Sequence, residues 1–473
     1  MSKKKLPFAG EPVVPNQLPA IPPAALDADT RAAILNDSRF DECRAMAITC
    51  LKGGLNAGSH FHEVWIRDLN TFLIPALEAV PPQQVRSALL DFLHFQNDKG
   101  DIPDGVVEEK KHDSYYKHFR RADSLPGRMA MKNSVSADQE TSFVQALARY
   151  VTHTEDRSIL RETHQGRSCL DHALDALEFL WTERWSPTHG LICNAATIDW
   201  HDVQPEDSHG LEMSESTHRA VGVYSNALAL LALDDLFALD VLDAEQNEKW
   251  RGRRTALAAA IREVLWDAER GKFVPHRYLE EGSPFPPELD EDAIFFPLGT
   301  GLAIRAGLLS EDEISRSWAA TAEAVRRAGA ASIGFSPWPP YPAGCYAAKG
   351  IQPWGYANGG DWTWWGAQTA AAYADAGYVA EAYKALLPMV ERVLRDREFF
   401  EWYDRHNVPA GKIKNPSPED KAKGWGALAK GAAQFRGAAG TLVIAIDLLR
   451  ELTENGRVAK GLGTDGTSPA LYT

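Results

Sequence analysis

Hydrophobic residues recur along most of this chain at the three-to-four-residue spacing that is typical of amphipathic α-helices. The pattern predicts twelve helices in six consecutive pairs, near residues 30–52, 67–79, 82–97, 137–154, 167–184, 220–240, 246–267, 291–306, 310–328, 361–376, 377–397 and 431–453. Apart from short candidates such as residues 190–195, little of the sequence alternates as a strand does. We therefore expect an all-α fold.

Polar and aromatic residues gather at the start of every second predicted helix. In a toroid of paired helices, alternate helices form the inner ring, and their starts converge at one end. Helix N-termini there offer unpaired N–H groups to oxygen-rich ligands. The sequence therefore predicts an (α/α)6 barrel with a functional funnel at that end. The clusters are residues 65–68, 136–140, 197–201, 356–362 and 434–437, with Tyr224 following the third.

The alternative for such a helical chain is an α-solenoid of the TPR or HEAT kind. Solenoids repeat every ~34–47 residues with recurring consensus positions, and this sequence has no such repeat. The predicted loops are unequal in length, which favours the barrel. We expect an extended N-terminal arm over residues 1–29, the barrel over 30–456 and a C-terminal tail over 457–473.

The charge of the chain limits its partners. A formal net charge of −15 disfavours nucleic acid and anionic membrane surfaces. No apolar run reaches the ~18 residues of a membrane span, and no apolar segment follows the N-terminal lysines as in a secretory signal. The five cysteines form no CxxC pair and are expected to be reduced and mostly buried. We expect a cytoplasmic protein, and the sequence leaves its oligomeric state open.

Several familiar sites are absent from the sequence. It contains no phosphate-binding G-x-x-x-x-G-K-[ST] loop, no dinucleotide-binding G-x-G-x-x-G after a strand, no H-E-x-x-H and no G-x-S-x-G. His60 and His62 lie two residues apart, but no partner carboxylate completes a metal site. We therefore expect neither a cofactor nor a metal, which leaves carboxylates and aromatic rings to carry the chemistry.

Two carboxylates are candidates for catalysis. Asp199 lies between Ile198 and Trp200, where partial desolvation would raise its pKa as a general acid requires. A loop aspartate can equally cap a helix, and the neighbouring Asp202 is a second candidate for the acid. Glu401 lies among aromatic residues, where its main structural alternative is a salt bridge to a flanking arginine.

The tryptophans of these clusters suggest a sugar as ligand. Flat apolar rings beside many hydrogen-bonding groups suit the C–H faces and hydroxyls of a polyol, and charged pairs such as Arg67 and Asp68 can orient those hydroxyls. A tryptophan stripe is more often part of a core, and Trp365, Trp402 and Trp425 also fall in these clusters. The candidate sugar contacts are Trp65, Arg67, Asp68, Asp138, Trp200, His201, Tyr224, Asn358, Asp361, Trp362, Trp364, Tyr403 and Gln434.

Five short motifs, in order along the chain, resemble those of the neutral/alkaline invertase family of six-hairpin glycosidases. Residues 64–69 resemble Val-Phe-x-Arg-Asp-Phe. Residues 197–200, followed by the helix from 222, resemble Met-Ile-Asp-Arg and Gly-x-x-x-Glu-x-Gln-Ala-Leu. Residues 356–362 resemble Tyr-His-Asn-Gly-Gly-x-Trp, residues 399–404 resemble Trp-Pro-Glu-Tyr-Tyr-Asp, and residues 434–440 resemble Gln-Thr-Trp-Ser-Ile-Ala-Gly. The glucosidase half of glycogen-debranching enzymes and the glucoamylases are more distant cousins.

The resemblance implies roles for particular residues. The acid aspartate of the family would fall on Asp199, its base glutamate on Glu401, and its substrate-binding pair on Arg67 and Asp68. The departures from the family are Asp361 in place of a small or uncharged residue, Thr363 and Phe400 in place of prolines, and Ser225 in place of a glutamate. Fold and mechanism survive these changes, whereas sucrose as substrate does not follow.

The function we expect is that of an inverting glycoside hydrolase that releases a terminal sugar from a small, α-linked glycoside or disaccharide. The alternatives on the same toroid are a glycoside phosphorylase, which needs a phosphate pocket, and a sugar epimerase. An alternative of another class is a non-catalytic α-helical scaffold that binds a protein. A deep pocket with two facing carboxylates would separate an enzyme from the scaffold.

Overall fold

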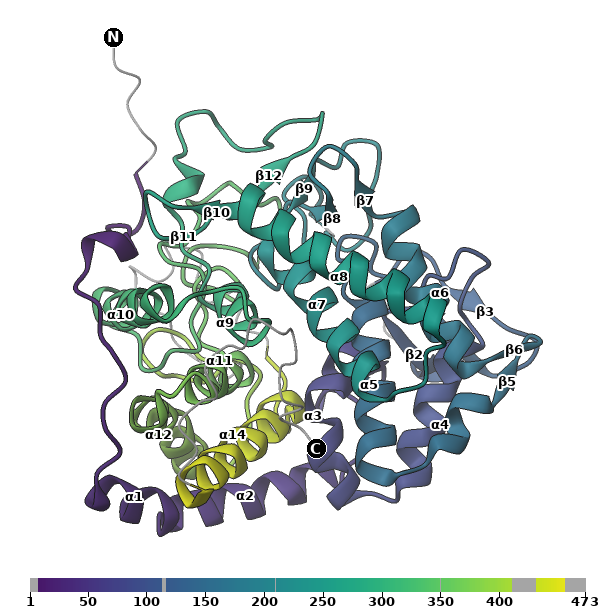
Figure 1. Cartoon of the computed structure of the whole chain (residues 1–473), viewed down its shortest axis with the longest axis horizontal. Helices are drawn as coiled ribbons and strands as arrows, with labels where there is room; N and C mark the ends of the chain where they lie inside the picture. The colour runs from purple at the N-terminus through teal and green to yellow at the C-terminus, as the bar shows by residue number, and fades with distance from the viewer. Residues whose placement is uncertain (1–6, 113–115, 209, 349, 411–430, 456–473) are drawn as a thin grey trace.

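The computed structural model describes residues 7–112, 116–208, 210–348, 350–410 and 431–455. Six helices pack side by side, each against the next, and the last packs against the first, so that they close a ring. The ring lies around the middle of the molecule in Figure 1. Its helices are α3 (Ile66–Ala79), α5 (Gln139–Thr154), α7 (Val223–Ala238), α9 (Pro297–Arg305), α11 (Thr363–Asp375) and α14 (Arg436–Asn455).

A second set of helices surrounds this ring and alternates with it along the chain. The outer helices are α2 (Ser38–Leu51), α4 (Pro82–Leu93), α6 (Cys169–Thr182), α8 (Ala244–Leu265), α10 (Glu311–Ala328) and α12 (Val379–Asp396), and the short α1 (Ala28–Leu35) precedes them. The chain therefore has the (α/α)6 architecture that the sequence predicts.

Burial explains which helices lie inside. Inner helices are buried on most sides, as α7 shows, where every residue from Val223 to Leu233 is buried. The outer helix α10 is amphipathic: Ile314 and Trp318 face the core, and charged residues face solvent. Outer helices α6, α8 and α10 begin with capping boxes, whereas the residues that precede α3, α5, α7, α9 and α11 provide no side-chain cap in the described structure.

Short strands and turns connect the helix pairs. One antiparallel sheet has the order β1 (Val64–Trp65), β2 (Gly105–Glu108), β4 (Arg128–Met131), β3 (Arg120–Arg121). A second has the order β12 (Arg277–Tyr278), β9 (Arg219–Val221), β8 (Leu191–Ala195), β7 (Trp185–Ser186). The hairpins β5 (Thr163–His164) with β6 (Arg167–Ser168) and β10 (Trp266–Asp267) with β11 (Lys272–Phe273), and the 3-10 turns η1 (Pro15–Gln17), η2 (Glu109–Lys111), η3 (Arg157–Arg161) and η4 (Glu291–Ala293), complete the named elements.

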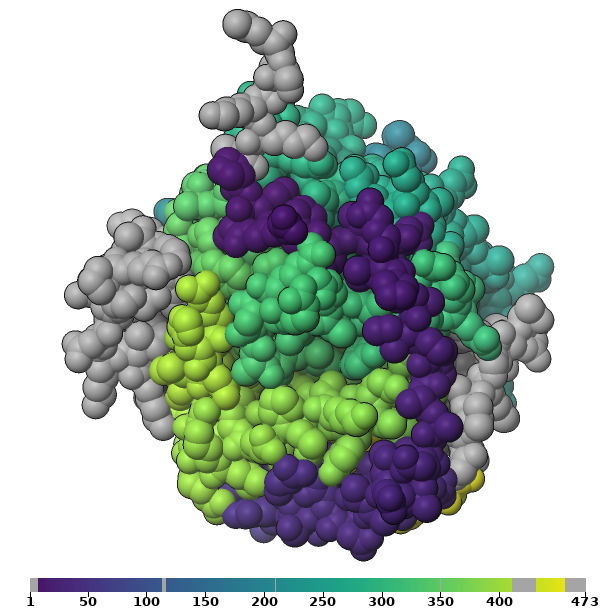
Figure 2. All heavy atoms as spheres, turned by 90° about the vertical axis from the view of Figure 1, so that its left-hand side faces the viewer, coloured from purple at the N-terminus to yellow at the C-terminus, as the bar shows by residue number. Residues whose placement is uncertain are grey.

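The segment before α1 runs in extended form over the outer helices, as Figure 2 shows in purple. The Trp338 indole N–H donates to the Glu11 carbonyl at 3.0 Å, and the Asn16 amide donates to the Ala268 carbonyl at 2.9 Å. Further along, the Ala24 N–H donates to the Glu381 carboxylate at 2.9 Å. These contacts hold the arm against the barrel.

The helices differ from the predicted ones in few places. The helix expected over 30–52 is two helices, because Asn36 ends the first one and Asp37 caps the second one at the Arg39 N–H. Strand β8 matches the candidate at 190–195, while β2, β3 and β4 lie between the helices predicted at 82–97 and 137–154. Trp425 and the expected tail over 457–473 lie outside the described residues.

Candidate active site

Arg67, in the first turn of α3, is held rigidly by a buried ion pair. Its Nε donates to Asp138 Oδ2 at 2.5 Å, and a second N–H donates to Asp138 Oδ1 at 3.2 Å. Asp138 also accepts from the Ser136 hydroxyl at 2.8 Å and from the Tyr224 hydroxyl at 3.0 Å. With its oxygens occupied in this way, Asp138 orients Arg67, and Tyr224 supports that pair.

Asp68, the next residue, lacks the hydrogen-bonded partners that Asp138 has. It is 8% exposed, and none of the described residues hydrogen-bonds its carboxylate. Burial raises the pKa of Asp68 well above its usual value, and the charges of Asp104, Glu401 and Asp202 raise it further, while Arg67 opposes the shift. A buried carboxyl group without a partner is costly. The Asp68 carboxylate can therefore accept hydrogen bonds from a ligand.

Glu401 lies close enough to Asp68 for its charge to act on the pKa of Asp68, and two donors fix its position. Its Oε1 accepts from the Tyr356 hydroxyl at 3.1 Å, and its Oε2 accepts from the Ala432 N–H at 2.7 Å. Burial raises the pKa of Glu401 to about 7, and the nearby charge of Asp202 contributes to the increase. A carboxyl group with a pKa near neutrality suits general acid–base catalysis.

Asp199 points to a different place, the N-terminus of α9. Its Oδ1 accepts from the Gly299 N–H at 2.9 Å, and its Oδ2 accepts from the Leu298 N–H at 3.1 Å and the Ser336 hydroxyl at 3.0 Å. Burial raises the pKa of Asp199 to about 7, against these hydrogen bonds. A side chain at Gly299 would place its Cβ 2.9 Å from Asp199 Oδ1. Asp199 thus connects its loop to α9 as a helix cap does.

Asp202, three residues later, faces Arg67 and Glu401. Its side chain is 26% exposed, and its Oδ2 lies 3.4 Å from an Arg67 guanidinium nitrogen. The charge of Asp202 contributes to the raised pKa values of Glu401, Asp68 and Tyr356. The loop therefore brings Asp202, and not Asp199, close enough to Glu401 for its charge to raise the pKa of Glu401.

His201 stands behind Asp202 with its tautomer fixed by the backbone. Its Nδ1 accepts from the Val203 N–H at 3.1 Å, so its proton lies on Nε2. Nε2 is 3.6 Å from Asp202 Oδ1 and has no hydrogen-bond partner among the described residues. Burial lowers the pKa of His201 to about 4, so the ring is neutral at pH 7 and turns an N–H towards Asp202.

The tryptophans of the site fall into a buried core group and the half-buried Trp65. The Trp200 ring lies 4.8 Å from that of Trp362 and 5.8 Å from that of Trp364, and all three are at most 3% exposed. They fill the centre of the ring as core. Trp65 is half-buried, and its ring is 5.9 Å from that of the buried Tyr116, whose hydroxyl bonds Asp104.

Four of the predicted contacts are engaged elsewhere or face solvent. The Asn358 side chain bonds both backbone groups of Tyr341, at 2.7 and 2.9 Å. Asp361 is fully buried, accepts from Ser332 and pairs with the guanidinium of Arg392 at 3.0 Å. The same guanidinium stacks over Tyr403 at 4.1 Å, and Gln434 is exposed. Asn358, Asp361 and Tyr403 thus support the loops of the site.

Sequence reasoning missed Asp104 and Tyr116 as site residues. The Tyr116 hydroxyl donates to Asp104 Oδ2 at 2.5 Å, and burial raises the pKa of Asp104 to about 6. Both lie between the helices predicted at 82–97 and 137–154, and they come near Arg67 and Asp202 because β2 pairs with β1 and β4 pairs with β2. Among the described residues, no group of three or more His, Cys, Asp or Glu could hold a metal ion, and no helix is long and apolar enough to cross a membrane.

Comparison with known proteins agrees with this fold. No family model matches the chain, and no curated protein matches it in sequence. Among solved structures it is similar to a GH63 mannosylglycerate hydrolase from Thermus thermophilus in complex with glucose, with 18% identity and a TM-score of 0.56 over 86% of this chain and 99% of that one.

Two further structures give the same result. A rhamnosidase from Klebsiella oxytoca with rhamnose bound has 14% identity and a TM-score of 0.53, over 89% of this chain and 65% of that one. A glycosidase in complex with glucose has 14% identity and a TM-score of 0.51, over 90% of this chain and 99% of that one. These similarities show the six-hairpin fold.

Proposed function

We propose that this protein is a glycoside hydrolase that releases a terminal sugar, with inversion, from a small α-linked glycoside or disaccharide in the cytoplasm. The observation that carries the proposal is the set of carboxylates around Arg67. Asp68 is buried without a hydrogen-bond partner among the described residues, and the charges of Asp202 and Glu401 act on its pKa. The three glycosidases of similar fold, each with a bound sugar, support this interpretation.

Glu401 is the general base of this proposal. The Tyr356 hydroxyl and the Ala432 N–H hold its two oxygens, and both donors favour the ionised form. An ionised Glu401 would take a proton from water as that water attacks the anomeric carbon. In an inverting enzyme the two carboxyl groups stand about 6.5–9.5 Å apart, with the water between the sugar and the base.

Asp202 is the general acid of this proposal, and geometry favours it over Asp199. An acid must present its proton to the glycosidic oxygen, but three donors already occupy the oxygens of Asp199. The Asp202 side chain is partly exposed and lies close enough to Glu401 for its charge to raise the pKa of that group. Proton transfer from Asp202 would break the glycosidic bond while the proton of water passes to Glu401, so the product anomer is opposite to that of the substrate.

The remaining groups would bind the sugar. Asp68 accepts from sugar hydroxyls, and Arg67, fixed by Asp138, donates to them. Trp65 and Tyr116 offer an apolar wall to the C–H faces of the ring. Because Asn358 and Asp361 are occupied by protein groups, we assign them to positioning rather than to direct sugar contact.

The test is a substrate screen. Purified protein is incubated with natural disaccharides and small α-glycosides, with and without inorganic phosphate, and product sugar is followed by NMR. Release of a free terminal sugar that does not depend on phosphate supports hydrolysis. Release only with phosphate, as a sugar phosphate, would instead indicate a phosphorylase, and conversion without bond cleavage would indicate an epimerase.

A further inference from the structure

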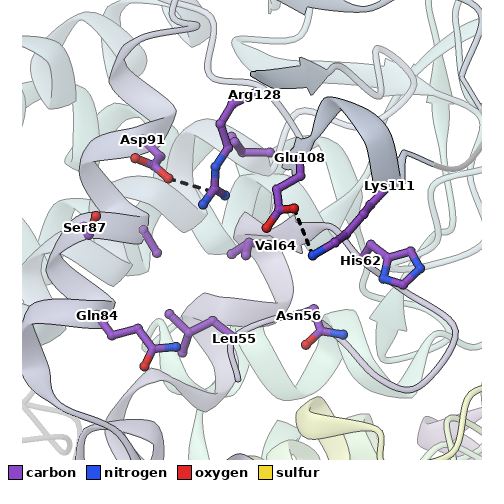
Figure 3. A pocket seen from close by; sticks show the side chains of 12 residues that line it. Leu55, Asn56, His62, Val64, Gln84, Ser87, Asp91, Glu108, Lys111 and Arg128 are labelled. Atoms are coloured by element: carbon purple, nitrogen blue, oxygen red, sulfur yellow. Dashed lines mark ion pairs between the residues drawn. The ribbon is translucent and has the colours of Figure 1, made fainter. Parts of the chain in front are cut away.

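A cavity of about 500 Å³ lies against the β1–β2 ribbon, and Figure 3 shows the side chains that line it. Val64 pairs with Val106 and lines the cavity with it. Successive residues of a strand point to opposite faces, so their neighbours Trp65 and Gly105 face the proposed active site. The cavity is therefore separate from that site, although only one ribbon lies between them.

The cavity has an apolar floor and polar walls. Its floor is formed by Leu55, Val64, Ala88 and Val106, of which Leu55 and Val106 are at most 5% exposed. The walls come from the loop after α2, from one face of α4, and from β2, η2 and β4. The polar wall residues are Asn56, His62, Gln84, Ser87, Asp91, Glu108, Lys111 and Arg128. Ligand pockets commonly combine such a floor with a few convergent polar groups.

Several of these polar groups have unused hydrogen-bonding capacity. The Arg128 guanidinium lies 3.7 Å from the Asp91 carboxylate, which is beyond hydrogen-bond distance. Among the described residues, the side chains of Arg128, Asp91, Gln84 and Ser87 make no hydrogen bond to the protein. Burial raises the pKa of Asp91, whose carboxylate points into the cavity in Figure 3.

The charges of the cavity cancel. Asp91 faces Arg128, and Glu108 pairs with Lys111 at 2.9 Å. Two carboxylates and two cations alternate around the apolar floor, so the site provides charged hydrogen-bonding groups without a net attraction for an anion or a cation. An uncharged molecule with many hydroxyls and an apolar face matches this arrangement, because each hydroxyl can donate to a carboxylate and accept from a cation.

We propose that this cavity is a second carbohydrate-binding site, which takes a neutral sugar and performs no chemistry on it. It uses the Arg128–Asp91 and Lys111–Glu108 pairs for the hydroxyls and the floor around Val64 for the C–H face. The site would hold sugar beside the active site, on the other side of β1.

The experiment uses the full chain with the Asp68→Ala substitution, which removes the proposed contact in the active site. Ligand-observed NMR titrations with glucose, mannose, galactose and maltose are made on this background. We expect at least one neutral sugar to bind. Adding Ser87→Trp, which fills the cavity from α4, should weaken that binding at least about tenfold. Gln83→Trp is the matched control, because Gln83 is an exposed neighbour on the same helix that does not line the cavity, and it should leave binding unchanged.

Two outcomes would overturn the proposal: no sugar of the panel binds, or Ser87→Trp and Gln83→Trp have equal effects. Glucuronate and glucosamine test the neutral class, and tenfold tighter binding of either than of glucose would contradict it. Should Ser87→Trp fail to fold, Arg128→Met decides in its place, and unchanged binding would count against the site. Hydrolysis by the wild-type chain is measured separately, so the two proposals can fail independently.

Discussion

Asp68 shows most clearly how single residues reveal the site. A carboxylate that only stabilised the fold would be paired, as Asp138 is with Arg67. Asp68 has a similar degree of burial but no such partner among the described residues. The folded protein therefore bears an energetic penalty at Asp68 that a bound sugar can relieve, and function explains the residue better than stability does.

Asp68→Asn should make the protein more stable and abolish binding of sugar in the active site. The pKa of Asp68 is raised in the folded state, so its ionised form opposes folding at any pH above the unfolded value near 3.9. We expect a gain of about 1–3 kcal/mol in the free energy of unfolding at pH 7, lost below about pH 4. Urea unfolding at both pH values measures it.

Asp138→Asn is the matched control for that measurement. It removes the charge that pairs with the buried Arg67, and breaking a buried ion pair costs about 3–5 kcal/mol. Equal destabilisation by Asp68→Asn and Asp138→Asn would show that Asp68 is a structural residue.

Asp202→Asn and Asp199→Asn separate the two candidates for the acid. We expect Asp202→Asn to lower turnover about 10²–10⁴-fold with a natural leaving group and much less with a nitrophenyl leaving group, which needs no protonation. Asp199→Asn should chiefly lower the melting temperature, because it weakens the contact with α9. A leaving-group-dependent loss in Asp199→Asn alone would transfer the acid role to Asp199.

The pH dependence of activity tests the role of Glu401. As a general base it must be ionised, so kcat/KM should rise with pH through a midpoint near its pKa of about 7. Tyr356→Phe removes a donor that favours the ionised form, so the midpoint should move to higher pH. Tyr373→Phe, in a buried tyrosine that bonds Thr321 instead, should leave the midpoint in place. A midpoint unaffected by Tyr356→Phe would separate this limb from Glu401.

At the scale of elements, the ribbon of β1 and β2 positions the aromatic wall. A Cβ at Gly105 would lie 2.4 Å from the Trp65 ring, so only glycine allows the ring to pack against the strand. Trp65 is in turn beside Tyr116, which reaches Asp104. Two short strands, rather than helices, therefore position the aromatic ring of Trp65 in the proposed active site.

Gly105→Ala should displace Trp65 and raise KM more than it lowers kcat. We expect it to reduce the free energy of unfolding by about 1–3 kcal/mol, as overpacking does. Gly252→Ala, in α8 with nothing within 4 Å of the added carbon, should instead stabilise the protein by about 0.5–1 kcal/mol with unchanged kinetics. Kinetics and thermal melting of both variants check this, and an unchanged KM in Gly105→Ala would contradict the role of Trp65.

The elements also show how far sequence reasoning reaches. The helices were predictable because each has a long periodic pattern, and their alternation placed the polar clusters on inner helices. Strands such as β1 and β2 have only two and four residues, too few for an alternating pattern to be recognised. The contribution of Asp104 and Tyr116 was hidden for that reason.

Local motifs predicted Asp68 and Glu401 as site candidates, but not the direction of each side chain. Asp199 and Asp202 are three residues apart in one loop, and the backbone turns between them, with Asp199 at a φ of 49°. No sequence pattern tells which of these two aspartate side chains faces Glu401. Likewise the sequence could not show that Asp361 is engaged by Arg392, 31 residues further along the chain.

At the scale of the whole molecule, the closed ring brings distant segments to one end. Asp68 starts α3, Asp202 lies before α7 and Glu401 lies before α14, so the three carboxylates come from different helix pairs. Among the described residues, no hydrogen bond joins Asp202 to Glu401. Inversion requires room for a water molecule between the sugar and the base.

The first-formed anomer of the product tests this account most directly. A fresh reaction with an α-glycoside from the substrate screen is followed by proton NMR before mutarotation. We predict that the β-anomer of the released sugar appears first, because Glu401 acts through water and forms no bond to the sugar. Appearance of the α-anomer first would mean that a carboxylate attacks the sugar directly, and it would contradict the mechanism proposed for Asp202 and Glu401.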